Sequence, residues 1–185
     1  MTSRDNPSQG EKETTDRSES EVYISLGSNI EPEKNLSQAV HLLRSKSNVL
    51  ATSSVYRTAP EGYRDQPDFL NTAVKLTTSL TPESFKSDVL DWIERALGRI
   101  RDPNNKNAPR TIDLDISLWG DGVFEYGTKP WRVPEPDIIR FAHVVIPLAE
   151  IAPDLVHPTE GVTLNEIAGR FDKHGIKRLE NSVLE

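Results

Sequence analysis

Residues 111–119 read TIDLDISLW, a run in which apolar and polar side chains alternate. Side chains of a β-strand point alternately to opposite faces, so this period predicts a strand with one buried face. The apolar members of the run are Ile112, Leu114, Ile116 and Leu118. Asp113 and Asp115 then lie together on the opposite face, about 7 Å apart. The chain must therefore place a layer of structure over one side of this strand and an acidic pair on the other.

The same kind of pattern predicts the elements that precede this strand. Strands are expected at 22–26, 49–57 and 69–78, where β-forming residues predominate. One helix is expected over 36–43, and a second begins after Thr81 and ends before Gly98. The apolar stripe of the second helix consists of Phe85, Val89, Trp92, Ile93, Ala96 and Leu97. The order strand, helix, strand, strand, helix, strand predicts an α+β fold, the ferredoxin-like α/β sandwich, whose helices cover one face of an antiparallel sheet and leave the other free.

The two ends of the chain are expected to lie outside this fold. Residues 1–20 contain no Val, Ile, Leu or aromatic residue, which predicts a disordered tail. Residues 21–175 are expected to form one domain, and residues 176–185 a frayed C-terminal tail. Within the domain, a C-terminal extension should contain a hairpin or loop at 120–133 and short helices near 147–151 and 164–171.

Charge and cysteine content exclude several classes of protein. The chain has 22 Lys and Arg against 29 Asp and Glu, a formal net charge of -7. This balance argues against nucleic acid or an anionic membrane as a general partner, because such binders carry excess positive charge. The absence of cysteine excludes disulfide frameworks, thiol nucleophiles and cysteine-based zinc sites, and is compatible with a cytoplasmic location. No apolar run approaches the roughly 20 residues that span a bilayer.

The acidic pair on the predicted strand is a candidate metal site. Two carboxylates at this spacing can hold one or two Mg²⁺ ions, which keep phosphate and water as their other ligands. The alternative is a solvated strand face without a metal.

A cluster of cations precedes the acidic pair. Arg99, Arg101, Lys106 and Arg110 lie within a short polar stretch. Guanidinium groups bind phosphate oxygens in a bidentate manner, so arginines beside a magnesium site indicate a polyphosphate. Alternatively, the cations pair directly with Asp113 and Asp115. No glycine-rich phosphate loop is present, and a nucleotide would therefore be held by side chains and metal.

Phe69 and Asn71 are expected on the same face as the aspartates. The ring of Phe69 can stack on a flat ligand, and the amide of Asn71 offers both donors and an acceptor to a heterocycle with an amide-like edge. Each residue could instead be structural, Phe69 in packing and Asn71 in a loop hydrogen bond.

With these residues in view, the chain resembles the 6-hydroxymethyl-7,8-dihydropterin pyrophosphokinase family of folate biosynthesis over residues 22–172. The most specific match is APRTIDLDI at 108–116, which resembles the family signature. Further matching motifs, in chain order, are LGSN at 26–29, SVYRT at 54–58, DQPDFLN at 65–71, GRIR at 98–101 and PLAEIAP at 147–153.

The resemblance implies transfer of pyrophosphate from ATP to the hydroxymethyl group of the pterin, with release of AMP. It implies two Mg²⁺ ions on Asp113 and Asp115, with Arg99 and Arg110 also acting in catalysis. The positions that match pterin contacts are Thr58, Ala59, Pro60, Glu61, Phe69 and Asn71. The positions that match ATP contacts are Glu94, Arg99, Arg101, Arg110 and Ile116.

The chain departs from the family pattern in two places. Members often carry Arg-Trp-Gly before the Pro-Arg, whereas Lys106, Asn107 and Ala108 stand here, so the aromatic lid is missing and loop closure should be looser. Further on, an ungapped alignment puts Glu135, Phe141 and His143 where the family has His, Arg and Phe. We expect His143 to stack on the pterin in place of the Phe. Arg132 and Arg140 are expected to supply positive charge to ATP.

Two other functions remain open from the sequence. One is a magnesium-dependent kinase or nucleotidyltransferase that acts on another small alcohol, which the altered lid and His143 would favour. The other is a non-catalytic ligand-binding domain of the same fold, although a pure binder would not need a paired metal site. The expected partners are small molecules only, and the expected state is a monomer.

Overall fold

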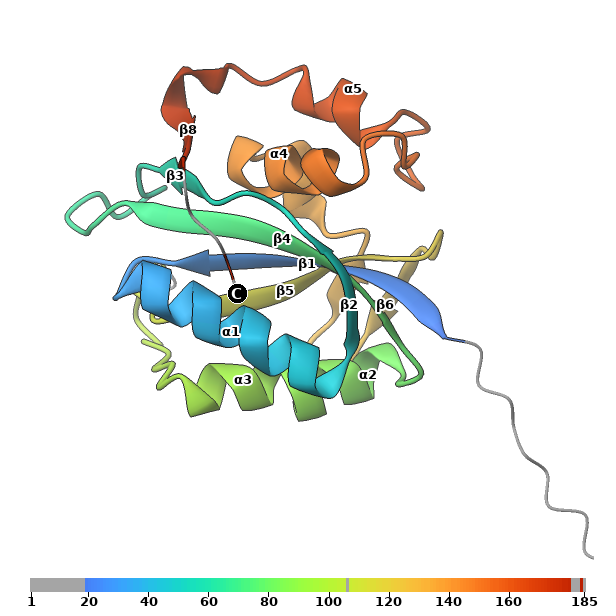
Figure 1. The fold of residues 1–185 in the computed structure, drawn as a ribbon, viewed down its shortest axis with the longest axis horizontal. Coiled ribbons are helices and arrows are strands. Elements are labelled where there is room, and N and C mark those ends of the chain that lie inside the picture. The colour runs from blue at the N-terminus through green and yellow to red at the C-terminus, as the bar shows by residue number, and fades with distance from the viewer. Residues whose placement is uncertain (1–18, 106, 181–183, 185) are drawn as a thin grey trace, which may run out of the picture.

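The computed structural model describes residues 19–105, 107–180 and 184 (Figure 1). Its first part comprises β1 (Ser20–Ser28), α1 (Pro32–Lys46), β2 (Asn48–Thr52), β3 (Tyr56–Thr58), β4 (Phe69–Thr78), α2 (Pro82–Phe85), the π-helical turn η1 (Lys86–Leu90), α3 (Asp91–Ala96) and β5 (Asp113–Trp119). The second part comprises β6 (Phe124–Tyr126), β7 (Trp131–Val133), η2 (Pro136–Ile139), α4 (Ala142–Ile151), α5 (Leu164–Ala168), η3 (Lys173–Gly175) and β8 (Ile176–Arg178). The predicted hairpin at 120–133 is the β6–β7 pair.

The main sheet is antiparallel, and β1 lies at its centre between β4 and β5. Its order is β5-β1-β4-β3-β8, and β2 also pairs with β4. This arrangement confirms the predicted ferredoxin-like sandwich. The predicted strand at 49–57 is in fact two strands, because the chain leaves the sheet after Thr52 and rejoins the same edge of β4 at Tyr56.

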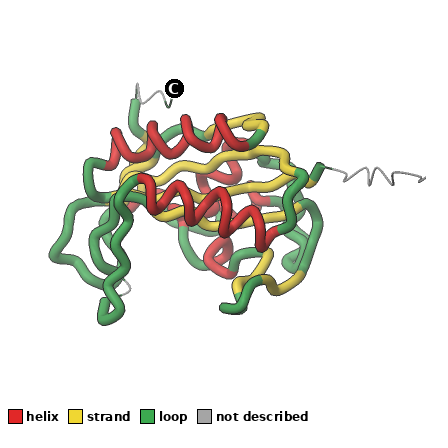
Figure 2. The backbone as a smooth tube through the Cα atoms, turned by 90° about the horizontal axis from the view of Figure 1, so that it is seen from below, coloured by secondary structure: helices red, strands yellow, loops and turns green. Residues whose placement is uncertain are grey.

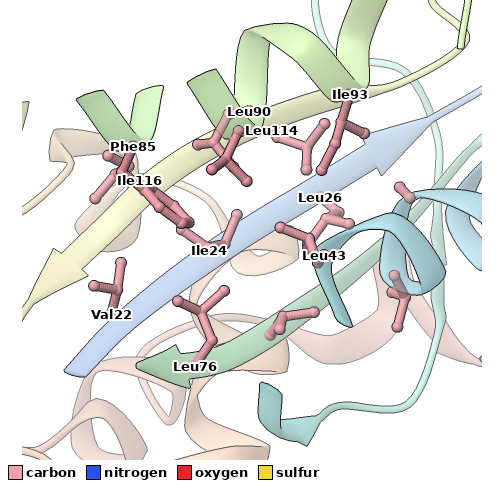
Figure 3. Packing of buried hydrophobic residues seen from close by; sticks show 14 of the residues in the cluster. Val22, Ile24, Leu26, Leu43, Leu76, Phe85, Leu90, Ile93, Leu114 and Ile116 are labelled. Atoms are coloured by element: carbon pink, nitrogen blue, oxygen red, sulfur yellow. The ribbon is translucent and has the colours of Figure 1, made fainter. Parts of the chain in front are cut away.

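One face of the sheet is covered by α1 and by the α2–η1–α3 segment. Figure 2, seen from the helix side, shows these two helical rods lying across the strands. Leu26, Leu76, Leu114 and Ile116 of the sheet contact residues such as Leu43 of α1 in one buried cluster (Figure 3). This packing explains the alternation of the 111–119 run, since burial of its apolar side chains removes them from water.

The second face of the sheet is not free, which corrects the prediction. Helix α4 covers it and α5 packs against α4 (Figure 1), and Tyr23, Ala73 and Leu118 belong to the buried cluster that these helices share with the sheet. Leu118 was expected beside Leu114, but the pairing of β1 with β5 shifts register between Tyr23 and Ile24, and this irregularity turns Leu118 to the other face.

The helical segment after Thr81 differs from a regular amphipathic helix. Thr81 caps it as predicted, accepting a hydrogen bond from the backbone N–H of Ser84 at 3.3 Å. The π-helical turn η1 then interrupts it, and the buried positions include Lys86 and Glu94. Trp92 and Ala96, which the apolar stripe places in the core, are exposed. An inserted π turn changes which side chains face the sheet, so a pattern based on 3.6 residues per turn misses the shift.

The C-terminal region contributes to the sheet. Ile176–Arg178 form β8, which pairs with β3, so a tail beginning at residue 176 is not what this part of the structure shows. The predicted N-terminal tail falls largely on residues 1–18, outside the described residues, and β1 already begins at Ser20. No helix in the described part of the chain is long and apolar enough to cross a membrane.

Glu150 links α4 to β3 and β8. Its carboxylate accepts hydrogen bonds from the backbone N–H of Ser54 at 3.0 Å, from Ser54 Oγ at 2.7 Å and from the Tyr56 hydroxyl at 2.8 Å. Arg178 of β8 lies 3.5 Å away as an ion pair. The PLAEIAP and SVYRT motifs are therefore joined in space, a contact that the sequence pattern alone does not predict.

We expect Glu150→Ala to lower the free energy of unfolding by about 2 kcal/mol, because one backbone and two side-chain donors lose a charged acceptor. Urea unfolding monitored by tryptophan fluorescence measures this change. Glu31→Ala is the control, since the carboxylate of Glu31 makes only an exposed pair with Lys34 at 3.1 Å among the described residues, and its backbone contact to Asn35 is kept in the variant. Equal stability losses in the two variants would contradict the structural role of Glu150.

Candidate functional site

The central strand β1 aligns the predicted site residues in a row across the sheet. Gly27 of β1 is paired with Asn71 of β4 on one side and with Asp113 of β5 on the other. Neighbouring strands lie about 4.8 Å apart, so Asn71 and Asp113 stand about 10 Å from each other. A Cβ atom on Gly27 would lie 3.2 Å from Asn71 Oδ1 and 4.0 Å from the Phe69 ring. The missing side chain therefore leaves open space between the amide and the carboxylate.

A cavity of about 230 Å³ occupies this space. Most of the predicted pterin and catalytic residues line it, namely Thr58, Ala59, Glu61, Phe69, Asn71, Arg110, Asp113, Asp115 and His143. Pro60 does not, and instead lines an adjoining cavity that shares Thr58 and His143. Asn71 Nδ2 donates to Thr58 Oγ1 at 2.9 Å, which fixes the orientation of the amide.

The remaining predicted residues line two further cavities. Glu94, Arg99 and Arg101 surround one of them together with Trp131. Ile116, Arg132 and Arg140 line the other, which shares Asp115 and Glu135 with the main cavity. The side chains of Arg132 and Arg140 are largely exposed, and each pairs with a nearby acid, Arg132 with Glu125 and Arg140 with Asp137. Lys106 lies outside the described residues.

Arginines surround Asp113. Arg110 Nη1 lies 2.5 Å from Asp113 Oδ2, and Arg99 Nη2 lies 3.7 Å from the same atom. The direct pairing left open by the sequence is therefore present at Asp113. The guanidinium of Arg110 also lies over the Phe69 ring at 5.5 Å. Burial lowers the pKa of Arg99, and its Nε is buried without a hydrogen-bond partner among the described residues. Such a donor suits an anionic ligand.

Asp115 and Glu135 are enclosed carboxyl groups. Burial and the charge of Asp113 raise the pKa of Asp115 to about 7. Burial and the charge of Asp115 raise the pKa of Glu135 well above its usual range. Glu135 accepts a hydrogen bond from Ser117 Oγ at 3.1 Å. Neither carboxyl has an ion-paired cation within 4 Å in the part of the chain that the structure describes.

These carboxylates fit the chemistry of a divalent cation only in part. Asp113 and Asp115 offer hard oxygen ligands at alternate strand positions, and burial raises the pKa of Asp115, an effect that a bound cation would oppose. No three His, Asp or Glu side chains converge at metal-binding spacing among the described residues. The protein would therefore supply two carboxylates, and phosphate oxygens and water would complete the shell.

Asn29 holds the loops around the cavity together. Its Nδ2 donates to Gln66 Oε1 at 2.9 Å and to the carbonyl of Pro67 at 3.1 Å. Its Oδ1 accepts from the backbone N–H of Arg110 at 2.8 Å. The LGSN motif thus fixes Arg110 to the loop that precedes Phe69, a role that sequence reasoning did not assign.

A pair of stacked rings forms one wall of the cavity. Phe141 and His143 lie with ring centroids 5.2 Å apart and planes at 25°. Burial lowers the pKa of His143, which favours the neutral imidazole, while Glu61 and Asp137 oppose this shift. Glu135 and Phe141, which the sequence analysis treated as departures, both line the cavity.

Taken together, the fold and the cavity define a ferredoxin-like small-molecule-binding protein whose site joins an aromatic and amide pocket to a cluster of carboxylates and arginines. The family model of 7,8-dihydro-6-hydroxymethylpterin-pyrophosphokinase matches residues 23–153. The chain therefore belongs to this pyrophosphokinase family.

Individual proteins similar to this chain carry names of the same family. A 2-amino-4-hydroxy-6-hydroxymethyldihydropteridine pyrophosphokinase of Methylorubrum extorquens is 40% identical over 86% of this chain and 98% of its own length. Folic acid synthesis protein fol1 of Pneumocystis carinii is 36% identical over 84% of this chain, which spans only 21% of that longer protein. Among solved structures, Plasmodium falciparum HPPK-DHPS matches with a TM-score of 0.70 and 12% identity, over 89% of this chain and 50% of that chain. This last likeness concerns the fold alone.

We expect Asp115→Asn to stabilise the metal-free protein at about pH 8 and to lose this advantage towards about pH 5. The folded-state pKa of about 7 lies above the value of 3.8 that the unfolded chain should have. Ionisation therefore penalises the native state progressively as pH rises between these values. Urea unfolding in the presence of EDTA measures the difference.

Asp121→Asn is the matched control for this experiment, because Asp121 is exposed and lies outside the cavity. A gain in the Asp115 variant that grows as pH falls would have the wrong sign and would contradict the assignment.

Proposed function

We propose that this chain transfers the β,γ-diphosphate of ATP to the hydroxymethyl oxygen of 6-hydroxymethyl-7,8-dihydropterin and releases AMP. The observation that carries this proposal is the row Asn71, Gly27, Asp113 across three strands. This row supports a pocket for a flat, amide-bearing ring at Asn71, beside the carboxylates and arginines that would suit a polyphosphate. Membership of the pyrophosphokinase family supports it.

The acceptor would lie between Phe69 and the rings of Phe141 and His143. Asn71 Nδ2 is already bound to Thr58, so Asn71 Oδ1 remains to accept from the pterin amide edge. Stacking and this amide contact would orient the hydroxymethyl group towards Asp113 and Asp115. Orientation of this kind supplies much of the rate enhancement in reactions that join two substrates.

The nucleotide would lie towards Arg99, Arg101 and Arg110. Arg99 has the buried Nε atom that lacks a hydrogen-bond partner among the described residues, and Arg101 is held by Glu94 at 2.6 Å. Arg110 would exchange its contact with Asp113 for phosphate oxygens. Guanidinium groups that meet the developing negative charge stabilise a phosphoryl-transfer transition state.

The reaction balances without a covalent intermediate. The hydroxymethyl oxygen forms a bond to the β-phosphorus of ATP, the bond from that phosphorus to the oxygen shared with the α-phosphate breaks, and AMP leaves with that oxygen. The hydroxyl proton is released to solvent. We propose Mg²⁺ as the cofactor, with two ions expected on Asp113 and Asp115, where it would neutralise charge on the transferred group. We also propose that the chain acts as a monomer in the cytoplasm, where ATP is available.

A different small alcohol is the second candidate acceptor. Glu61, Glu135 and Asp137 line the cavity beside the stacked Phe141–His143 pair. This wall would favour an acceptor with more hydrogen-bond donors than the pterin. With such an alcohol as acceptor, the proposed contacts of ATP with the arginines would be the same, and only the second substrate would differ.

The direct test is incubation of the protein with ATP, Mg²⁺ and 6-hydroxymethyl-7,8-dihydropterin, followed by separation of the nucleotides. We expect AMP to form only when the pterin is present. Asp113→Ala and Asp115→Ala should lower kcat by about two orders of magnitude or more while the fold remains intact, because both side chains line the cavity and belong to neither buried apolar cluster. Asp121→Asn serves as the control here as well.

Formation of ADP would instead indicate a simple kinase. Pterin-independent hydrolysis, or no turnover at all, would reject the pterin as acceptor. Near-normal turnover in the two alanine variants would reject the carboxylate site.

Gly27→Ala tests the acceptor pocket. The added Cβ would lie 3.2 Å from Asn71 Oδ1, so the amide must move by a few tenths of an ångström. We expect KM for the pterin to rise about tenfold while KM for ATP changes less. Gly169→Ala is the control, because the added atom meets only ordinary contacts from 3.4 Å outward at the end of α5. An unchanged pterin KM in Gly27→Ala would place the acceptor elsewhere.

A further inference from the structure

Lys86 is a buried lysine beneath the carboxylate cluster, and no step above uses it. Only 4% of its surface is exposed, and it lies in the π-helical turn η1. Its Nζ donates a hydrogen bond to the backbone carbonyl of Leu114 at 3.0 Å. Asp91 Oδ1 lies 3.2 Å from the same Nζ. An ammonium is costly to bury, so its retention calls for a physical explanation.

The partner of Lys86 is the residue between the two site aspartates. Leu114 separates Asp113 from Asp115 on β5, an edge strand that pairs with β1. The backbone N–H of Leu114 donates to Glu94 Oε1 at 3.1 Å. Both backbone polar groups of Leu114 are therefore bound by charged side chains, Lys86 on the carbonyl and Glu94 on the amide. Such groups on an edge strand would otherwise need another partner.

These two contacts come from one helical segment on the core side of the strand. The side chain of Leu114 is fully buried and points towards Leu90 and Ile93 of that segment (Figure 3). The backbone of Leu114 is thus fixed at its side chain, its amide and its carbonyl. Because strand residues alternate, fixing Leu114 also fixes the directions of Asp113 and Asp115 on the opposite face.

Lys86 leaves the cavity itself open. It is not among the residues that line the cavity, and it reaches β5 through the backbone carbonyl of Leu114.

We propose that Lys86 is a positioning residue that, together with Glu94, clamps the backbone of Leu114 and so holds Asp113 and Asp115 in the geometry that binds the cation and nucleotide. This inference rests on the proposed function, since it assigns a role in the same site. A purely structural lysine would support the fold but leave the kinetic constants of the folded protein unchanged.

Two variants of Lys86 separate the effect of its charge from the effect of its hydrogen bond. Lys86→Met removes the charge and the donors at similar length, and Lys86→Gln retains a neutral donor. We expect Lys86→Met to lower kcat about tenfold and to weaken binding of Mn²⁺ with a non-hydrolysable ATP analogue, measured by electron paramagnetic resonance, by a similar factor. KM for the pterin should change less than about twofold, and Lys86→Gln should fall between Lys86→Met and the unmodified protein.

Lys75→Met is the matched control. Lys75 also pairs with an acid, Glu21 at 2.9 Å, and lies over an aromatic ring, that of Tyr23 at 5.5 Å. It lies outside the cavities that hold the site residues. If Lys86→Met and Lys75→Met have equal kcat and equal Mn²⁺–nucleotide affinity at a temperature where both are folded, Lys86 is structural and the proposal is overturned.

A measurement on the unmodified protein covers the case in which Lys86→Met does not fold. Amide hydrogen exchange should show slow exchange at Leu114 despite its place on an edge strand. Fast exchange at Leu114 would overturn the clamp directly. A wrong proposed function would give a different result. In that case the unmodified protein, with Lys86 in place, would itself form no AMP from ATP and the pterin.

Discussion

The site depends on the pairing of the central strand β1 with β4 and β5. This pairing brings Asn71, Gly27 and Asp113 into one row across the sheet. Ala73, Ser25 and Asp115 form the next row on the same face, two residues away along β1. A side chain at position 27 would fill the space between the amide and the carboxylate, and glycine leaves it open. A slip of one residue in either pairing would turn the odd-numbered side chains of that strand to the opposite face. The apolar residues on the other face prevent such a slip, because it would expose them.

The charges around this row are arranged before any ligand binds. Asp113 is paired with arginines, whereas Asp115 and Glu135 are enclosed carboxyl groups with raised pKa values. Such an arrangement destabilises the folded protein at neutral pH, since buried like charges repel and lack water. A cation and a polyphosphate would relieve this repulsion. The stability of the free protein is thus lowered by the same electrostatics that would favour the ligands.

Sequence alternation was sufficient to place Phe69, Asn71, Asp113 and Asp115 on one face, because strand geometry leaves two choices for each side chain. It could not predict the register shift near Tyr23, which moves Leu118 to the other core cluster. The burial of Lys86 was not predicted, because a lysine on a helix normally faces solvent and a period of 3.6 residues does not anticipate a π turn. The role of Glu150 also depends on contacts between distant segments.

The two substrates would be held by structures on opposite faces of the sheet. The proposed nucleotide site would depend on the α2–η1–α3 segment through Glu94 and Lys86, which bind the backbone of β5. The proposed acceptor site would depend on α4, which carries His143 at one end and contacts β3 through Glu150 at the other. Strand β8 adds a partner to β3 and lies beyond residue 153, where the family match ends. Because an edge strand with few contacts moves easily, this addition restrains Thr58, and Thr58 in turn orients Asn71. The chain beyond the matched region therefore supports the proposed acceptor pocket. Its residues Phe171 and Ile176 line the adjoining cavity beside Thr58, but none of its described residues lines the main cavity at Asn71.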